Sequence, residues 1–240
     1  MARYKETREG AFSRSSTPWP DAEPARPRVT RDKVVRTALD VLDHDGLDGL
    51  TMRRLAERMG IKAASLYNHV RNKDNLLALI ADAICDQVSD IDQASSWRDQ
   101  LYALAAQFRK ALVAHRDGAR ILAATPPLGP NRLRIIEQVL KTLVSAGFST
   151  VEAADVASVH NSYVVGFVLD ETLGGANDKA SLRRTREAGR RWFKSLSRDQ
   201  YPTLVALADQ LVGASTDRRF SFGVQALLDG FASRLSGKRN

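Results

Sequence analysis

Apolar residues recur at helical spacing along nearly the whole chain after Thr30, and this pattern limits the possible folds more than any other feature. Side chains three and four residues apart are apolar in segment after segment, whereas no segment alternates apolar and polar residues over a strand's length. The helical patterns outside the N-terminal region cover 97–113, 132–146, 150–169, 182–196 and 220–235. The sequence therefore predicts an all-α protein.

The composition indicates a globular protein with excess positive charge. The 240 residues are 43% hydrophobic, which is enough for one or two packed cores. The net charge of +8 favours polyanionic partners, either nucleic acid or an anionic membrane surface, and charge alone does not choose between them. No apolar run reaches the roughly 18 residues of a membrane span, and the first 28 residues lack the apolar segment of a secretory signal. We therefore expect a cytoplasmic protein without a membrane partner, in which the single Cys85 is a small core residue.

Residues 1 to 28 differ from the rest of the chain. They combine basic residues and serines with four prolines between Pro18 and Pro27, a mixture that cannot bury a core. We expect a flexible basic arm. One interpretation is an arm that follows a DNA groove, and the other, which the composition favours, is a leader without a function.

Helix start and stop signals follow in close succession from residue 29. Threonine and asparagine side chains can accept hydrogen bonds from the first free N–H groups of a helix, and glycine readily ends one. The expected helices run from Thr30 to Gly46, from Thr51 to Gly60, from 63 to 70 and from Asn72 to Ile91. The stretch from Thr51 to Val70 is therefore predicted to be a helix-turn-helix.

The second helix of this motif has an outer face suited to DNA. If Leu66 and Val70 point inward, the four-residue spacing turns other side chains of this helix outward, namely Ala63, Ala64, Ser65, Tyr67 and Asn68. Small residues let a helix approach bases, hydroxyls reach phosphates and asparagine can pair with adenine. Neighbouring cations would bind phosphates and make the affinity salt-dependent. The alternative is an ordinary helical hairpin with a solvated basic face.

Several runs of residues resemble one family. The run TMRRLAERMGIKAASLYNHVRNKDNLL, preceded by DGLDGL, resembles the DNA-binding domain of the TetR family of transcriptional regulators. SSWRDQL, FRKALVAHRDGARI and SAGFS are similar to the C-terminal body of the tetracycline repressors within that family. The resemblance covers about 28–235 and is weak after Gly174. It implies a three-helix DNA-binding domain at 29–75 and a ligand-binding and dimerisation domain at 76–240.

The resemblance also implies roles for single residues in the DNA-binding domain. Arg53 matches a guanine-reading arginine, while Ala63 stands where a base-reading glutamine is expected, which implies a different operator sequence. The residues expected at the DNA are Arg53, Lys62, Ala63, Ala64, Ser65, Tyr67, Asn68, His69 and Lys73.

A homodimer is expected because one short recognition helix reads few base pairs, whereas a two-fold dimer reads a palindrome. The helices at 151–169 and 220–235 resemble those that form the family's intersubunit four-helix bundle. Taken alone, their periodicity slightly favours two core helices of a monomer.

The family's drug pocket maps onto residues in the C-terminal half. The matching positions are Leu104, Phe108, Leu122, Thr125, Gln138 and, contributed by the second protomer of the dimer, Asp170. Leu122 replaces a magnesium-binding histidine, Leu104 an asparagine and Ser89 a further histidine. We therefore expect no metal ion and a rather apolar effector, which would act through the helix at 72–91. The alternative is that the leucines and Phe108 fill the core without a cavity.

The sequence thus predicts a repressor that a small molecule releases from operator DNA. A non-specific DNA-binding protein, or an activator without a small-molecule inducer, remains the alternative. We expect no enzyme and no cofactor, because the four histidines are scattered and no phosphate-binding or metal-ligand motif accompanies them. His160 with Asp170 is the one acid–base pairing worth considering.

Overall fold

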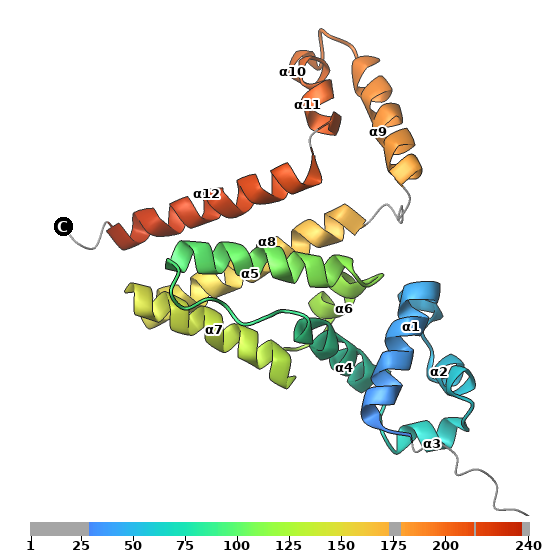
Figure 1. Cartoon of the computed structure of the whole chain (residues 1–240). Coiled ribbons are helices and arrows are strands. Elements are labelled where there is room, and N and C mark those ends of the chain that lie inside the picture. The colour runs from blue at the N-terminus through green and yellow to red at the C-terminus, as the bar shows by residue number, and fades with distance from the viewer. Residues whose placement is uncertain (1–28, 173–178, 214, 237–240) are drawn as a thin grey trace, which may run out of the picture.

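A computed structural model describes residues 29–172, 179–213 and 215–236, and these residues form twelve α-helices and no strand (Figure 1). This confirms the predicted all-α class. The expected arm at 1–28 lies outside the described residues. The helices are α1 (Arg31–Gly49), α2 (Met52–Met59), α3 (Ala63–Tyr67), α4 (Lys73–Asp86), α5 (Trp97–Val113), α6 (Gly118–Ala124), α7 (Pro130–Ala146), α8 (Thr150–Thr172), α9 (Lys179–Lys194), α10 (Pro202–Ala206), α11 (Ala208–Gly213) and α12 (Thr216–Ser236).

The first three helices form a small head with the capping interactions that the sequence predicts. The side chain of Thr30 accepts a hydrogen bond from Lys33 N at 3.2 Å, and that of Thr51 accepts one from Arg54 N at 3.1 Å. Gly46 has a φ of 75° and marks a kink near the end of α1. The core of the head consists of fully buried side chains from three helices and the α1–α2 connection, namely Val34, Leu42, Leu50, Leu55 and Leu66.

The body consists of α5, α6, α7, α8 and α12, and α4 joins it to the head (Figure 1). Helix α8 packs against α5, α6, α7 and α12, so it lies at the centre of the body. Helix α4 contacts α1 on one side and α6 and α7 on the other. The head and the body therefore meet at α4.

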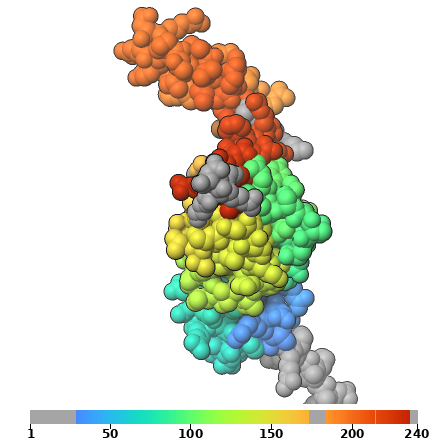
Figure 2. Space-filling model, turned by 90° about the vertical axis from the view of Figure 1, so that its left-hand side faces the viewer, coloured from blue at the N-terminus to red at the C-terminus, as the bar shows by residue number. Residues whose placement is uncertain are grey.

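Helices α9, α10 and α11 pack mainly against one another and extend away from the body (Figure 2). The side chains of Trp192, Tyr201, Leu204 and Leu211 on this projection are exposed. The sequence did not predict α10 and α11, because elements of five and six residues are too short to show a helical period. Residues 173–178 lie outside the described residues, and α9 begins at Lys179 rather than at the predicted 182.

Several predicted helix boundaries differ from those in the structure. Helix α3 ends at Tyr67 rather than Val70, and α4 ends at Asp86 rather than Ile91. In both cases the chain leaves the helix, but a later apolar residue, Val70 or Ile91, is still buried. The apolar pattern therefore continues beyond the end of the helix. Helix α7 begins at Pro130 rather than at the predicted 132, since proline is favourable at a first helical position, and the short α6 was not predicted. No described helix is long and apolar enough to cross a membrane.

Candidate DNA-binding surface and ligand pocket

The turn between α2 and α3 fixes the orientation of the short third helix. Gly60 adopts the left-handed conformation with a φ of 66°, which favours glycine because a Cβ is disfavoured there. Gly60 N donates to Glu57 O at 3.1 Å and Ile61 N donates to Ala56 O at 3.0 Å, the pair of bonds of a Schellman motif. The free carbonyls at the end of α2 are thus satisfied, and the chain turns directly into α3.

Helix α3 presents one buried side and one exposed side. Leu66 is fully buried and Val70, just after the helix, is 1% exposed. The exposed residues are Ala63, Ala64, Ser65, Tyr67 and Asn68, the outer face that the sequence predicts. Tyr67 is 51% exposed, although a large aromatic ring gains from burial. This face is therefore available to a partner, and its chemistry suits a major groove.

Cations surround this face, and one of them, Arg53, already has a weak partner. Lys62 and Lys73 are exposed, while His69 is half-buried. Arg53 Nε lies 2.9 Å from Glu57 Oε1, and this hydrogen bond raises the pKa of the Arg53 side chain. Because both side chains are well exposed, such a pair contributes little to stability and can be exchanged for a phosphate contact.

A second connection between head and body involves the turn between α5 and α6. Asp117 Oδ2 accepts from Leu47 N at 2.9 Å, and Asp43 Oδ1 accepts from Arg116 N at 3.0 Å. His115 Nδ1 lies 3.1 Å from Asp43 Oδ2, so this histidine holds α1 as well as shaping the turn. Burial would raise the pKa of Asp117, but the bond from Leu47 and the Arg120 ion pair lower it below its usual value. The carboxylate therefore stays charged and holds the end of α1.

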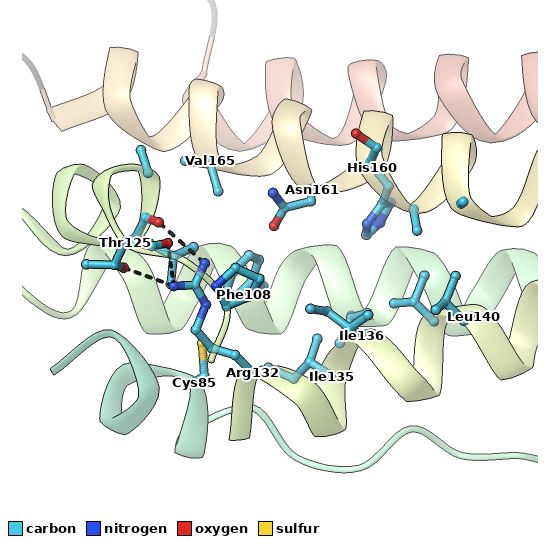
Figure 3. Close-up of a pocket in the computed structure, with 18 residues that line it drawn as sticks. Cys85, Phe108, Thr125, Arg132, Ile135, Ile136, Leu140, His160, Asn161 and Val165 are labelled. Atoms are coloured by element: carbon cyan, nitrogen blue, oxygen red, sulfur yellow. Dashed lines mark hydrogen bonds between the residues drawn. The ribbon is translucent and has the colours of Figure 1, made fainter. Parts of the chain in front are cut away.

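A cavity of about 470 Å³ lies in the body, bounded by α5, α6, α7 and α8 (Figure 3). This volume is typical of sites for small organic molecules. Four of the six predicted ligand residues line it: Leu104, Phe108, Leu122 and Thr125. Most other lining side chains are also apolar, among them Ile135, Ile136, Val139, Leu140 and Val165. These residues therefore surround a cavity rather than fill a solid core.

The other two predicted ligand residues do not line this cavity in the single chain. Gln138 Nε2 donates to Asp90 Oδ1, and Gln138 Oε1 is buried without a hydrogen-bond partner among the described residues. Asp170 is exposed near the end of α8. Its expected contribution to a pocket of a second protomer stays a prediction.

One end of the cavity is polar, and the sequence analysis missed the residue that dominates it. Arg132, in the first turn of α7, lines the cavity and donates from Nη1 to Thr125 O and Thr125 Oγ1, both at 2.9 Å (Figure 3). Its spacing from Ile135, Ile136 and Val139 puts it on the inward face of α7. The sequence alone could therefore have identified Arg132 as a residue that points into the body. Cys85 is beside this end, and burial raises the pKa of its thiol to about 12, so it is uncharged.

The structure does not pair the two residues considered for acid–base chemistry. His160 Nε2 donates to Leu101 O at 3.0 Å, and burial lowers the pKa of the imidazole. Asp170 lies ten residues further along α8, a rise of about 15 Å. Among the residues that the structure describes, no cluster of three metal-ligating side chains occurs either.

Comparisons with known proteins agree with this architecture. Residues 34–80 match the model of bacterial regulatory proteins of the tetR family, and residues 92–235 match that of the tetracyclin repressor-like C-terminal domain. The tetracycline repressor protein class A from transposon 1721 of Escherichia coli is 37% identical over 216 residues, which cover 89% of this chain and 95% of the relative.

Solved structures of ActR, a TetR family protein of Streptomyces coelicolor, are similar as well. Apo ActR from Streptomyces coelicolor has a TM-score of 0.78 and 32% identity, over 88% of this chain and 98% of ActR. ActR in complex with actinorhodin has a TM-score of 0.77 and 32% identity, over 87% of this chain and 99% of ActR. Both the head and the body therefore have counterparts in each of these relatives.

Proposed function

Because this chain belongs to the TetR family of bacterial transcriptional regulators, we propose that it represses transcription by binding a palindromic operator as a homodimer until a small molecule releases it. The observation that carries the proposal is the position of α4, which joins the head that exposes α3 to the body that holds the cavity. In this proposal 29–75 form the DNA-binding domain and 76–240 the ligand-binding and dimerisation domain. Because the operator of a bacterial gene lies in the cytoplasm, the protein would act there.

The proposed contacts with DNA divide into base reading and phosphate binding. Arg53 reads a guanine after exchanging its exposed pair with Glu57 for the base edge. Ser65, Tyr67, Asn68, His69 and Lys73 contact phosphates and groove edges, and Lys62 adds positive charge. Ala63 and Ala64 let the backbone approach the groove and contact thymine methyl groups. Because Ala63 has no polar group, the operator should differ from that of the tetracycline repressors at the corresponding base pair.

The proposed dimer forms through α8 and α12. Both helices leave large apolar side chains uncovered in the single chain: Val151 is 70% exposed, Val159 44% and Phe222 74%. Burying this surface against a second copy would remove it from water, which favours association. The two heads would then face successive major grooves on one side of the DNA.

The proposed effector is a mainly apolar molecule. Leu104 and Leu122 have no oxygen or nitrogen atom in their side chains, so they cannot bind the magnesium ion of a tetracycline chelate. The related ActR binds actinorhodin. Gln138 and, in the dimer, Asp170 of the second protomer would provide polar contacts at the rim of the pocket.

The proposal is tested by selecting binding sites from a random pool of double-stranded DNA with the full-length protein. We expect an inverted repeat, bound by a dimer in light scattering, and weaker binding after addition of a cavity ligand. Recovery of sequences without any consensus would instead support non-specific DNA binding. A scattering mass of one chain at micromolar concentration would contradict the dimer.

A further inference from the structure

The cavity contains one cation, at the end where α7 begins. Arg132 projects from the first turn of α7 toward the loop between α6 and α7 (Figure 3). Its guanidinium donates to Thr125 O and Thr125 Oγ1 at 2.9 Å, to Pro126 O at 3.2 Å and to Leu122 O at 3.4 Å. All of these acceptors are uncharged. Burial lowers the pKa of Arg132, yet an arginine side chain remains charged at neutral pH.

No carboxylate of the described residues forms an ion pair with this guanidinium. The nearest acidic residue, Asp82 on α4, uses Oδ1 to accept from Arg132 N at 3.0 Å and Oδ2 to accept from Asn131 Nδ2 at 3.1 Å. By contrast, the partly buried Arg109 in the same body binds Glu171 and Asp217, both at 2.7 Å. A charge that is partly removed from water is normally paired, so a half-buried guanidinium bound only to uncharged acceptors is unusual.

The geometry leaves one edge of the guanidinium free. The four hydrogen bonds come from Nη1 and, at 3.4 Å, from Nη2, and Nε donates to no acceptor of the described residues. The Nε and Nη2 groups form the planar fork that binds a carboxylate through two parallel hydrogen bonds. An apolar cavity with such a fork at one end matches a molecule with an apolar body and one anionic oxygen group.

We infer that the effector is an organic acid whose anionic oxygen, a carboxylate or an acidic phenolate, binds the free edge of Arg132 while its apolar body fills the cavity. This inference rests on the proposed function, since it names the chemical class of the molecule that this pocket takes. The anion gives the guanidinium the charged partner that it does not have among the described residues. The cavity should therefore bind such acids more tightly than their neutral analogues.

The test compares matched acids and neutral analogues against matched variants. Isothermal titration calorimetry on the full-length protein would use naphthalene, anthracene and anthraquinone carboxylic acids with their primary amides. Acidic phenols of the same ring systems with their methyl ethers distinguish a phenolate from a carboxylate. The variants are Arg132→Gln, Arg132→Lys and, as control, Arg134→Gln, which removes a cation two residues away that pairs with Asp90 and does not line the cavity.

We expect the wild-type protein and Arg134→Gln to bind the acid of at least one pair on the order of 10-fold to 100-fold more tightly than its neutral analogue, as charge-assisted hydrogen bonds allow. Arg132→Gln should remove this preference while keeping the affinity for the neutral analogue, which also shows that the cavity is intact. Arg132→Lys should retain part of it.

Two results would overturn the inference. Either the neutral analogues bind the wild-type protein as tightly as the acids, or the preference for acids persists in Arg132→Gln. Binding of no compound in the set would also count against it. The proposed function fails in a different way, namely if acids bind through Arg132 but never weaken binding to the selected operator.

Discussion

Replacing Asp82 by alanine should destabilise the protein far more than replacing a neighbouring carboxylate on the same helix. Asp82 is 9% exposed on α4, yet it satisfies two donors from the first turn of α7, Asn131 Nδ2 and Arg132 N. Gly129, the residue that precedes α7, has no side chain to cap it. Asp82 therefore acts as the N-cap of a helix that is 50 residues away in sequence.

The magnitude follows from what alanine leaves behind. Two donors lose their acceptor, and a donor left unsatisfied in a buried position costs about 1–3 kcal/mol. Since the site is near the surface and water can reach part of it, we expect a total loss of about 2–4 kcal/mol for Asp82→Ala. Asp82→Asn keeps one acceptor oxygen and should cost about half as much. The control, Asp86→Ala one turn later, removes an exposed side chain and should stay within about 0.5 kcal/mol of wild type.

Urea unfolding followed by circular dichroism measures these differences. The protein concentration must be constant, because dimerisation contributes to the apparent stability. The slope of the unfolding free energy with urea should be the same for all variants, so that the midpoint reports stability alone. A urea midpoint of Asp82→Ala equal to that of Asp86→Ala would refute the capping role. Equal losses of stability in Asp82→Ala and Asp82→Asn would refute the argument that one remaining acceptor oxygen preserves part of the cap.

Three further predictions concern the DNA contacts, a buried histidine and a turn. Arg53→Ala should relax base preference, whereas Lys73→Ala should weaken binding to every sequence and reduce the slope of log affinity against log salt by about 0.9 per protomer; titrations on selected and scrambled DNA check this, and equal losses on both would contradict it. Burial lowers the pKa of His160, so between that pKa and about 6.5 the unfolded chain binds more protons and stability falls as pH falls. Urea midpoints at pH 7.5 and 5.0 should differ less in His160→Gln than in wild type, and an unchanged difference would exclude His160 as a source. Gly60→Ala should cost about 1 kcal/mol from backbone strain alone, since nothing lies within 4 Å of the added Cβ, whereas Gly46→Ala should cost more because its φ of 75° and ψ of 178° form a combination that glycine alone adopts readily; unfolding midpoints in the opposite order would contradict this.

Local signals allowed much of the fold to be predicted from the sequence. The caps at Thr30, Thr51 and Asn72 depend on a side chain and an N–H group three residues away, so the sequence contains both partners. The bounds of α5 at Trp97 and Val113 follow from one uninterrupted apolar stripe. The family resemblance then located the cavity through Leu104 and its neighbours, which spacing alone left as possible core.

What could not be predicted depends on contacts between segments distant in sequence. Spacing alone can place Arg132 on the inward face of α7, but only the structure shows that Thr125 lies against it and that Asp82 already accepts from other donors. The same holds for the bond from Leu47 to Asp117, which spans 70 residues. Such pairs obey no local period, and only the assembled fold brings their partners together.

The head is held to the body at two places, the turn before α6 and helix α4, and both are connected to residues at the cavity. Helix α6 has seven residues, about 10 Å of rise, and the turn at its start holds α1 through Asp117 while Thr125 at its end lines the cavity beside Arg132. Helix α4 is held through Asp82 to the backbone of Arg132 itself. An anion that binds the free edge of Arg132 and shifts its guanidinium would therefore act on α1 and α4 together, without a long chain of intermediate contacts. The extent of operator release is then bounded by how much better the anion binds the displaced arrangement than the one present without it.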